Sequence, residues 1–184
     1  MEQVFEVVNR LLVLDERTRR RNLRMRTYMV VPLSSSVAVL EFVKGTQALG
    51  DVIEHAYKKH MPDKGQFQGV GRGDLRSLEN SSRKHDMARK REIYDRNVGR
   101  LPPALHYHFL DRFKDADDWF EARQIYTRSS AVTSIVGYVL GVGDRHLSNI
   151  MMDIDRGELV MIDLGIAFDA VRPFAPGCRL CADM

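Results

Sequence analysis

The residues best suited to chemistry lie in two short polar stretches late in the chain. Asp144, His146 and Asn149 occur in a glycine-containing loop, and Asp163 follows an apolar run further on. A carboxylate and an amide oxygen are hard ligands that Mg²⁺ accepts, with water and phosphate oxygens filling its other positions. Asn149 and Asp163 are therefore candidate metal ligands. Asp144 is a candidate acceptor for the proton of an attacking hydroxyl group.

A predicted β-hairpin connects the two polar stretches. Residues 150–154 and 158–162 are rich in apolar side chains and flank Asp155-Arg156-Gly157, which is typical of a three-residue hairpin loop. In an antiparallel pair, we expect Asn149 and Asp163 to face each other with Cα atoms about 5 Å apart. Asp, Asn, Gly and His are also ordinary turn residues. The loop alone favours turn chemistry, whereas the loop and the hairpin together favour a metal site.

A long helix is expected immediately before the loop. The acidic start at Asp117 suits the positive end of a helix dipole, and the apolar spacing predicts a helix over 117–140. Two glycines, Gly141 and Gly143, are expected to end it and to permit the backbone angles of the loop. The face of this helix predicted to enter the core consists of Trp119, Phe120, Ile125, Val132, Ile135, Val136 and Val139.

The first third of the chain predicts a helix, two strands and a second helix. Apolar residues at helical spacing indicate a helix over 1–14. Alternation predicts strands over 23–33 and 37–43, and Thr46 is expected to cap a helix over 46–57. Further on, we expect an exposed charged helix over 75–98 and a short helix over 104–113.

Composition indicates one intracellular globular domain. The chain has 184 residues, 44% hydrophobic and 29% charged, with a formal net charge of +3, which is too small to imply nucleic acid as an obligate partner. The sequence predicts neither a membrane span nor a signal peptide.

Cys178 and Cys181 lack further ligands and are expected to be reduced thiols. An arginine run is expected to be a solvated helix end, with a nuclear-localisation or nucleic-acid patch as the alternative: Arg17, Arg19, Arg20, Arg21, Arg24 and Arg26.

Two motifs together resemble a kinase signature. Gly143-Asp144-Arg145-His146-Leu147-Ser148-Asn149, followed by Ile162-Asp163-Leu164-Gly165, is similar to the signature of the phosphatidylinositol 3-kinase-related kinases. Protein kinases carry His-Arg-Asp with an Asn five residues after the Asp, and then Asp-Phe-Gly. In this chain the triplet reads Asp144-Arg145-His146, which reverses His-Arg-Asp, and Asn149 still follows the Asp by five residues. Trp119-Phe120-Glu121-Ala122-Arg123 and the ending Ile166-Ala167-Phe168 resemble the ataxia-telangiectasia mutated branch and its fungal telomere-maintenance counterpart.

The resemblance implies an α+β fold that is part of the PI3/PI4-kinase catalytic domain. By this resemblance residues 1–45 are the end of the small lobe and the hinge. Residues 46–170 are a large-lobe segment, and residues 171–184 are a divergent tail. The glycine-rich loop and phosphate-binding lysine of the family precede its first helix and have no counterpart in the printed residues.

The same resemblance assigns a role to each candidate residue. It implies phosphoryl transfer from ATP to a protein serine or threonine, with Mg²⁺ or Mn²⁺ as the metal. Asp144 would orient or deprotonate the hydroxyl, and His146 would lie near the transferred phosphate. Asn149 and Asp163 would hold the metal. Adenine would contact the Glu41 carbonyl, Phe42 and the Val43 N–H, above a floor of Met151 and Ile162.

Partners and location follow only from the resemblance. It implies protein substrates, regulatory protein partners and a nuclear role in DNA-damage signalling and telomere maintenance. No direct nucleic-acid contact and no membrane association are expected. Two alternatives stay open: a catalytically incomplete fragment or scaffold remnant, and a phosphatidylinositol lipid kinase. The lipid kinase requires basic inositide-contacting residues in the activation segment, which the tail barely preserves.

Overall fold

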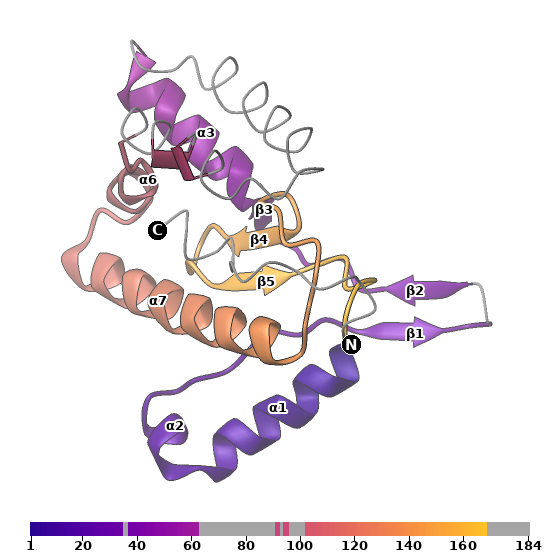
Figure 1. Ribbon diagram of the computed structural model, residues 1–184. Coiled ribbons are helices and arrows are strands. Elements are labelled where there is room, and N and C mark those ends of the chain that lie inside the picture. Colours follow the sequence, from indigo (N-terminus) through magenta and orange to yellow (C-terminus); the bar gives the residue numbers. More distant parts are fainter. Residues whose placement is uncertain (35–36, 63–90, 93, 96–101, 169–184) are drawn as a thin grey trace. The chain divides into compact units, whose positions relative to one another are not determined.

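The computed structural model describes residues 1–34, 37–62, 91–92, 94–95 and 102–168 (Figure 1). The chain forms two compact units, one from Met1–Asp51 with Phe109–Met184 and one from Val52–His108. All the candidate site residues belong to the first unit. The predicted tail with Cys178 and Cys181 lies outside the described residues. So does most of the predicted helix over 75–98, although its described residues are helical.

The chain opens with two helices. Helix α1 (Glu2–Leu14) confirms the predicted first helix and buries Phe5, while Val7 and Leu11 stay exposed. A short helix α2 (Glu16–Arg20) follows at once. Its N-cap is Asp15, whose carboxylate accepts hydrogen bonds from the first free backbone N–H groups of α2 at 3.0 Å.

A two-stranded ribbon follows an extended segment. Strand β1 (Val30–Pro32) pairs antiparallel with β2 (Ala38–Leu40), and the ribbon extends away from the rest of its unit (Figure 1). The predicted strand over 23–33 is wrong for residues 23–29, which are extended but not part of a sheet. Side chains of α1 bond this backbone, so another strand is not needed to satisfy it.

A three-stranded antiparallel sheet carries the predicted hairpin. Strand β4 (Ile150–Asp153) lies between β3 (Thr46–Ala48) and β5 (Leu159–Met161), and the turn between β4 and β5 contains Gly157 at φ +74°. The hairpin is confirmed. The helix expected from Thr46 instead begins three residues later, as α3 (Leu49–His60), because Thr46–Ala48 pairs with β4.

Two helices lead into the polar loop. Helix α6 (Leu105–Arg112) and helix α7 (Ala116–Val139) confirm the predicted helices, and Asp115 caps α7. Helix α7 packs against β5. Its predicted core face is wrong in part, because Phe120, Ile135 and Val139 are 52%, 59% and 72% exposed. Val132 and Val136 are buried as predicted, and four further small residues also enter the interior: Ala122, Ser129, Ser130 and Thr133.

Each unit has its own buried cluster. In the first unit, residues from α1, the segment between α2 and β1, α7, the loop after α7 and β5 meet in one core: Phe5, Met25, Val132, Val136, Val142 and Met161. In the second unit, Ala56 and Tyr57 of α3 pack with Ala104. The first core places the end of α7 beside the hairpin, and the candidate site is built on that junction.

Candidate active site

The end of α7 fixes where the polar loop begins. Gly141 has φ +60°, its N–H donates to the Tyr138 carbonyl at 3.2 Å, and the Val142 N–H donates to the Gly137 carbonyl at 2.8 Å. These two bonds are the Schellman pattern, which closes a helix with a left-handed residue. Gly141 therefore ends the helix as predicted. Val142 is buried in the core, so the following residues start from a fixed point.

Asp144 and Asn149 are held together across the loop. The Asn149 side-chain amide donates from Nδ2 to the Asp144 carbonyl at 3.0 Å, with a longer contact of 3.5 Å to the Asp144 carboxylate. Asn149 is 8% exposed, whereas the Asp144 side chain is about half exposed. Asp144 has φ +57°, an uncommon conformation that Asp tolerates better than most residues. The loop thus presents an open carboxylate on a fixed backbone.

His146 lies beside Asp144. Its Nε2 is 3.9 Å from Asp144 Oδ1, and both side chains are about half exposed. The contact is an ion pair only when the imidazole is protonated. The structure therefore brings the two predicted catalytic side chains together at an accessible surface.

Arg145 ties the loop to the segment that carries Asp163. Its guanidinium donates to the carbonyls of Gly143 at 2.7 Å and Ile162 at 2.6 Å, and also to the Asp163 carbonyl. Partial burial lowers the pKa of Arg145, and the nearby Asp144 and Asp163 carboxylates oppose that shift. One cation thus fixes the backbone on both sides of the candidate metal site.

Asp163 does not lie directly opposite Asn149. The register of the hairpin pairs Ile150 with Met161, and the Ile162 N–H donates to the Asn149 carbonyl at 3.1 Å, so Asn149 faces Ile162. The expected facing pair is wrong by one residue. Asp163 has φ +52°, which turns the chain immediately after the hairpin.

The donor set fits a magnesium ion that also binds phosphate. Because Nδ2 of Asn149 donates to Asp144, its Oδ1 is the amide atom left for a cation, and Asp163 supplies an exposed carboxylate. Magnesium commonly uses one or two protein ligands together with water and substrate phosphates. Among the described residues, no group of three or more His, Cys, Asp or Glu side chains is placed to hold a metal by itself.

A cleft of about 530 Å³ adjoins the segment after β2. The predicted hinge residues Glu41, Phe42 and Val43 line it, opposite Arg26, Thr27 and Tyr28. Glu41 is anchored by its own N–H to the Met29 carbonyl, and its carboxylate accepts from the Met29 N–H, both at 2.8 Å. Among the described residues, neither the Glu41 carbonyl nor the Val43 N–H is in a hydrogen bond. An acceptor and a donor are thus available to an adenine edge.

The two predicted floor residues lie on the hairpin. Met151 is opposite Val160, and Ile162 follows Val160 by two residues, so Met151 and Ile162 are on one face of the sheet. Both are partly exposed, whereas Ile150 and Met152 on the other face are completely buried. Neither is among the residues that line the cleft, so the structure brings the floor residues to each other and not to Glu41.

Comparison with known proteins decides the family. The family model for phosphatidylinositol 3- and 4-kinases matches residues 1–180. The chain belongs to that kinase family. Its α+β fold is accordingly part of a PI3/PI4-kinase catalytic domain, as predicted.

Within the family the chain is similar to Tel1 kinases. It is 42% identical over 172 residues to the serine/threonine-protein kinase tel1 of Aspergillus oryzae and 41% identical over 169 residues to TEL1 of Saccharomyces cerevisiae. These matches cover 94% and 92% of this chain and 6% of each relative. A solved structure of the FAT and kinase domain of CtTel1 matches with a TM-score of 0.77 and 40% identity, over 92% of this chain and 12% of that one.

Two features of this candidate site were missed by the sequence reasoning. In the sequence, Arg145 is distinguished only as part of a motif, yet its guanidinium bonds three backbone carbonyls of the site. In the sequence, Asp153 and Glu158 are ordinary residues of the predicted hairpin, yet in the structure they are only 7% and 4% exposed. The signal was available, because two acids inside an apolar hairpin require buried counter-charges.

Proposed function

We propose that this chain carries the catalytic loop and metal-binding part of an ATP-dependent serine/threonine protein kinase that acts in DNA-damage signalling and telomere maintenance in the nucleus. The observation that carries the proposal is the junction at Arg145. One guanidinium joins the loop of Asp144 and Asn149 to the segment of Asp163. We take Asp144 as the proton acceptor and Asn149 and Asp163 as the metal ligands of this junction, because phosphoryl transfer depends mainly on the positioning of such groups.

The proposed reaction assigns a step to each of these groups. The substrate hydroxyl oxygen forms a bond to the γ-phosphorus of ATP, the bond from that phosphorus to the β,γ-bridging oxygen breaks, and ADP leaves. Asp144 accepts the hydroxyl proton. Its carboxylate is about half exposed, so a substrate hydroxyl can reach it. His146 adds a second polar group near the transferred phosphate. The chemistry that Mg²⁺ or Mn²⁺ supplies at Asn149 and Asp163 is neutralisation of charge on the phosphate oxygens.

The adenine is proposed to bind in the cleft. The Glu41 carbonyl accepts from its amino group and the Val43 N–H donates to a ring nitrogen, with Phe42 at the entrance. Phe42 is 83% exposed, which leaves its ring available to a ligand. Met151 and Ile162 do not line the cleft, but they share a face of the hairpin and are only partly buried, so they are proposed as an apolar floor on the hairpin side of the bound nucleotide.

Partners are proposed from the relatives. Protein substrates suit the serine/threonine-protein kinase names of the relatives, and regulatory protein partners are proposed from the family resemblance alone. Direct contact with nucleic acid or membrane is not part of the proposal. Across the part of the chain that the structure describes, no helix combines the length and apolar character needed to cross a membrane.

A transfer assay tests the proposal. The chain is incubated with Mg²⁺, ATP labelled at the γ-phosphate and protein or peptide acceptors, and Asp163→Ala is compared with Asp118→Ala, which removes an exposed acid from α7. We expect transfer to serine or threonine that Asp163→Ala lowers by about a hundredfold or more and Asp118→Ala leaves unchanged.

Each other result has a defined meaning. Nucleotide binding without transfer to any acceptor would support the non-catalytic scaffold. Asp163-dependent transfer to phosphatidylinositol but not to protein would support the lipid kinase. Transfer that survives Asp163→Ala would remove this residue from the metal site.

A further inference from the structure

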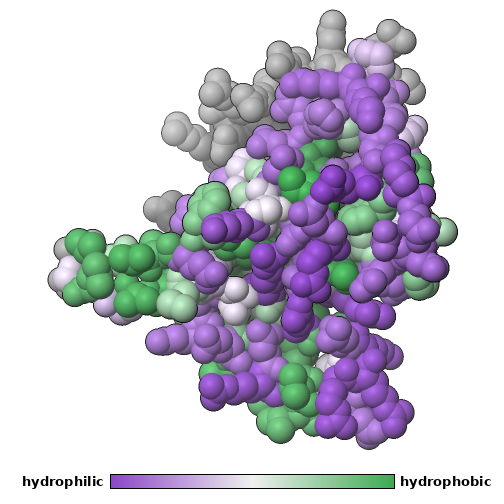
Figure 2. Space-filling view, turned by 180° about the vertical axis from the view of Figure 1, so that it is seen from behind, coloured by the Kyte–Doolittle hydropathy of each residue, from purple (hydrophilic) through white to green (hydrophobic). Residues whose placement is uncertain are grey.

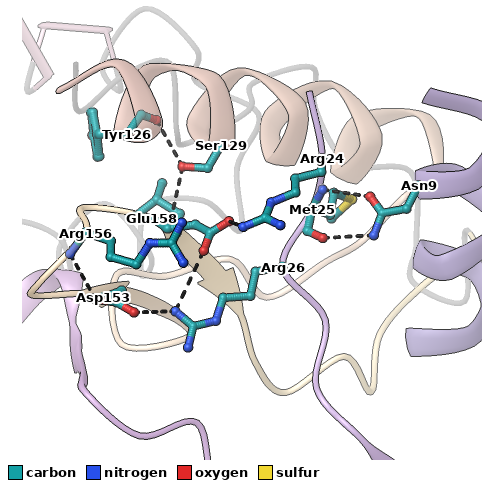
Figure 3. Close-up of polar contacts among 10 residues, drawn as sticks. Asn9, Arg24, Met25, Arg26, Tyr126, Ser129, Asp153, Arg156 and Glu158 are labelled. Atoms are coloured by element: carbon teal, nitrogen blue, oxygen red, sulfur yellow. Dashed lines mark hydrogen bonds and ion pairs between the residues drawn. The ribbon is translucent and has the colours of Figure 1, made fainter. Parts of the chain in front are cut away.

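The extended segment over residues 23–28 is hydrogen-bonded to side chains of helix α1 on one side. The Asn9 side chain bonds both backbone groups of Met25, donating to its carbonyl at 2.9 Å and accepting from its N–H at 2.8 Å (Figure 3). Glu2 accepts a hydrogen bond from the Tyr28 N–H at 3.2 Å. Two side chains therefore replace the partner strand that this segment lacks.

The hairpin β4–β5 holds the segment through a network of charges. Arg26 Nη1 lies 2.5 Å from Asp153 Oδ2 and 3.8 Å from Glu158 Oε2, and Arg24 Nη2 lies 3.2 Å from Glu158 Oε1. Both arginine side chains point toward the hairpin in Figure 3. The expected solvated arginine run is therefore wrong for Arg26, whereas Arg24 pairs with Glu158 while its side chain stays 54% exposed. Because Asp153 and Glu158 are almost fully buried, losing a counter-charge is costly.

Arg26 differs from Arg24 in its place beside the cleft and in its burial. Both bond the hairpin, but only Arg26 lines the cleft next to the hinge, where Thr27 and Tyr28 continue the same wall. The Arg26 side chain is 26% exposed and that of Arg24 is 54% exposed. Arg26 is thus the side chain through which the cleft wall is attached to the hairpin.

The attachment point on the hairpin is close to the proposed floor of the site. Asp153 follows Met151 by two residues in β4, so both side chains are on the same face, roughly 7 Å apart along the strand. The Asp153 carboxylate also accepts hydrogen bonds from the Asp155 and Arg156 N–H groups at 3.0 Å, which fixes the turn. A displacement of Arg26 is therefore transmitted to a rigid part of the hairpin.

We propose that Arg26 is a nucleotide-positioning residue, whose ion pairs with Asp153 and Glu158 hold the hinge cleft in a fixed position relative to the metal-binding hairpin. This inference rests on the proposed kinase function. A nucleotide that binds adenine at Glu41 and Val43 and phosphate near Asn149 requires both ends of the site at a set separation. Loss of the Arg26 anchor is expected to weaken nucleotide binding more than it slows the chemical step.

The test compares matched substitutions. Arg26→Gln and Arg24→Gln each remove one arginine charge from Glu158, but only Arg26→Gln releases the cleft wall. For Arg26→Gln we expect the Kd of a fluorescent ATP analogue and the KM for ATP to rise about tenfold, with kcat changed less than about twofold. Arg24→Gln is expected to leave both constants near those of the unaltered chain. Arg26→Lys keeps the charge and is expected to restore most of the affinity.

A second variant keeps the test decisive if Arg26→Gln does not fold. Asp153→Asn removes the charge facing Arg26 while keeping an oxygen for the turn, and it is expected to weaken nucleotide binding in the same way. Equal binding by the Arg26→Gln and Arg24→Gln variants, or a lower melting temperature with unchanged nucleotide affinity, would overturn the inference. An unaltered chain that binds no nucleotide would instead overturn the proposed function and, with it, this inference.

Discussion

Glu2 is a buried carboxylate with an incomplete set of partners. It is 8% exposed, and one of its oxygens accepts from the Tyr28 N–H, while among the described residues nothing bonds the other. Burial raises the pKa of Glu2 above its ordinary value of 4.5, and the Tyr28 N–H opposes that shift. The folded chain therefore holds this proton to higher pH than the unfolded chain does.

The sign of the pH effect follows from that difference. The contribution of Glu2 to the free energy of unfolding is fully present below the unfolded pKa and is lost as pH rises through the folded one. We expect Glu2→Gln to raise the free energy of unfolding by about 1 kcal/mol at pH 7 and to have no such effect at about pH 3.5. Urea unfolding of the variant and the unaltered chain at both pH values measures this change in the free energy of unfolding.

The control for Glu2 lies on the same helix. Glu6 is exposed on α1, so Glu6→Gln removes the same charge without changing a buried group. It is expected to change the free energy of unfolding by less than about 0.5 kcal/mol at both pH values. A loss of stability at pH 7 in Glu2→Gln would show that the ionised carboxylate, with its bond to the Tyr28 N–H, is favourable.

At the scale of the elements, two glycines with nearly the same φ allow two costs of an added Cβ to be distinguished. One is the cost of a left-handed backbone, and the other is the cost of crowding by neighbouring atoms. Gly157 in the β4–β5 turn has φ +74° and Gly45 before β3 has φ +73°. A Cβ at Gly157 would lie 3.0 Å from the Ala122 carbonyl oxygen and 3.0 Å from the Phe109 ring, whereas a Cβ at Gly45 meets nothing within 4 Å. The close approach of α7 and α6 to the turn makes glycine necessary there.

Alanine at each position measures the two effects. Gly45→Ala is expected to cost about 1 kcal/mol, because only the left-handed backbone is penalised. Gly157→Ala is expected to cost about 3 kcal/mol, because the neighbouring carbonyl and ring must also move. Denaturant unfolding of both variants provides the comparison. Equal losses would mean that the turn relaxes away from Phe109 without cost.

The elements also show what the sequence could and could not predict. The hairpin β4–β5 was predictable because two apolar runs and a glycine turn are adjacent in the chain. Strand β3 was not, because its three residues acquire their structure only by pairing with β4, about a hundred residues away. Hydrophobicity alone does not predict the buried face of α7, because Ser129 is buried with its hydroxyl accepting a hydrogen bond from the Leu159 N–H at 3.1 Å.

For the whole molecule, the predicted site residues come together in two places. Asp144, His146 and Asn149 were predictable as a group because they share one loop. The link from that loop to Asp163 was not, because it runs through Arg145, whose backbone partners depend on tertiary structure. The cleft at the hinge likewise depends on Arg26 and its pairing with acids more than a hundred residues away.

The ribbon β1–β2 leaves an apolar surface open. Figure 2 shows hydrophobic side chains gathered on the ribbon, and its exposed residues, 40% to 65% accessible, are Met29, Val30, Val31, Leu33, Val37, Val39 and Leu40. Contiguous exposed apolar surfaces of this kind mark contacts with other protein. In the relatives the matched region is only 6% of the length, so much further protein is present there. For the chain by itself, the same surface favours self-association.

Paired substitutions on the ribbon test this expectation. Val31 and Val39 are opposite each other, and threonine keeps their shape and strand preference while adding a polar group. We expect Val31→Thr with Val39→Thr to weaken self-association about tenfold in sedimentation experiments and to lower binding of an apolar dye. Val7→Thr with Val13→Thr is the matched control, because these exposed valines lie on α1 instead. If both pairs change association equally, general surface hydrophobicity is responsible; if only the ribbon pair does, β1–β2 is the contact surface.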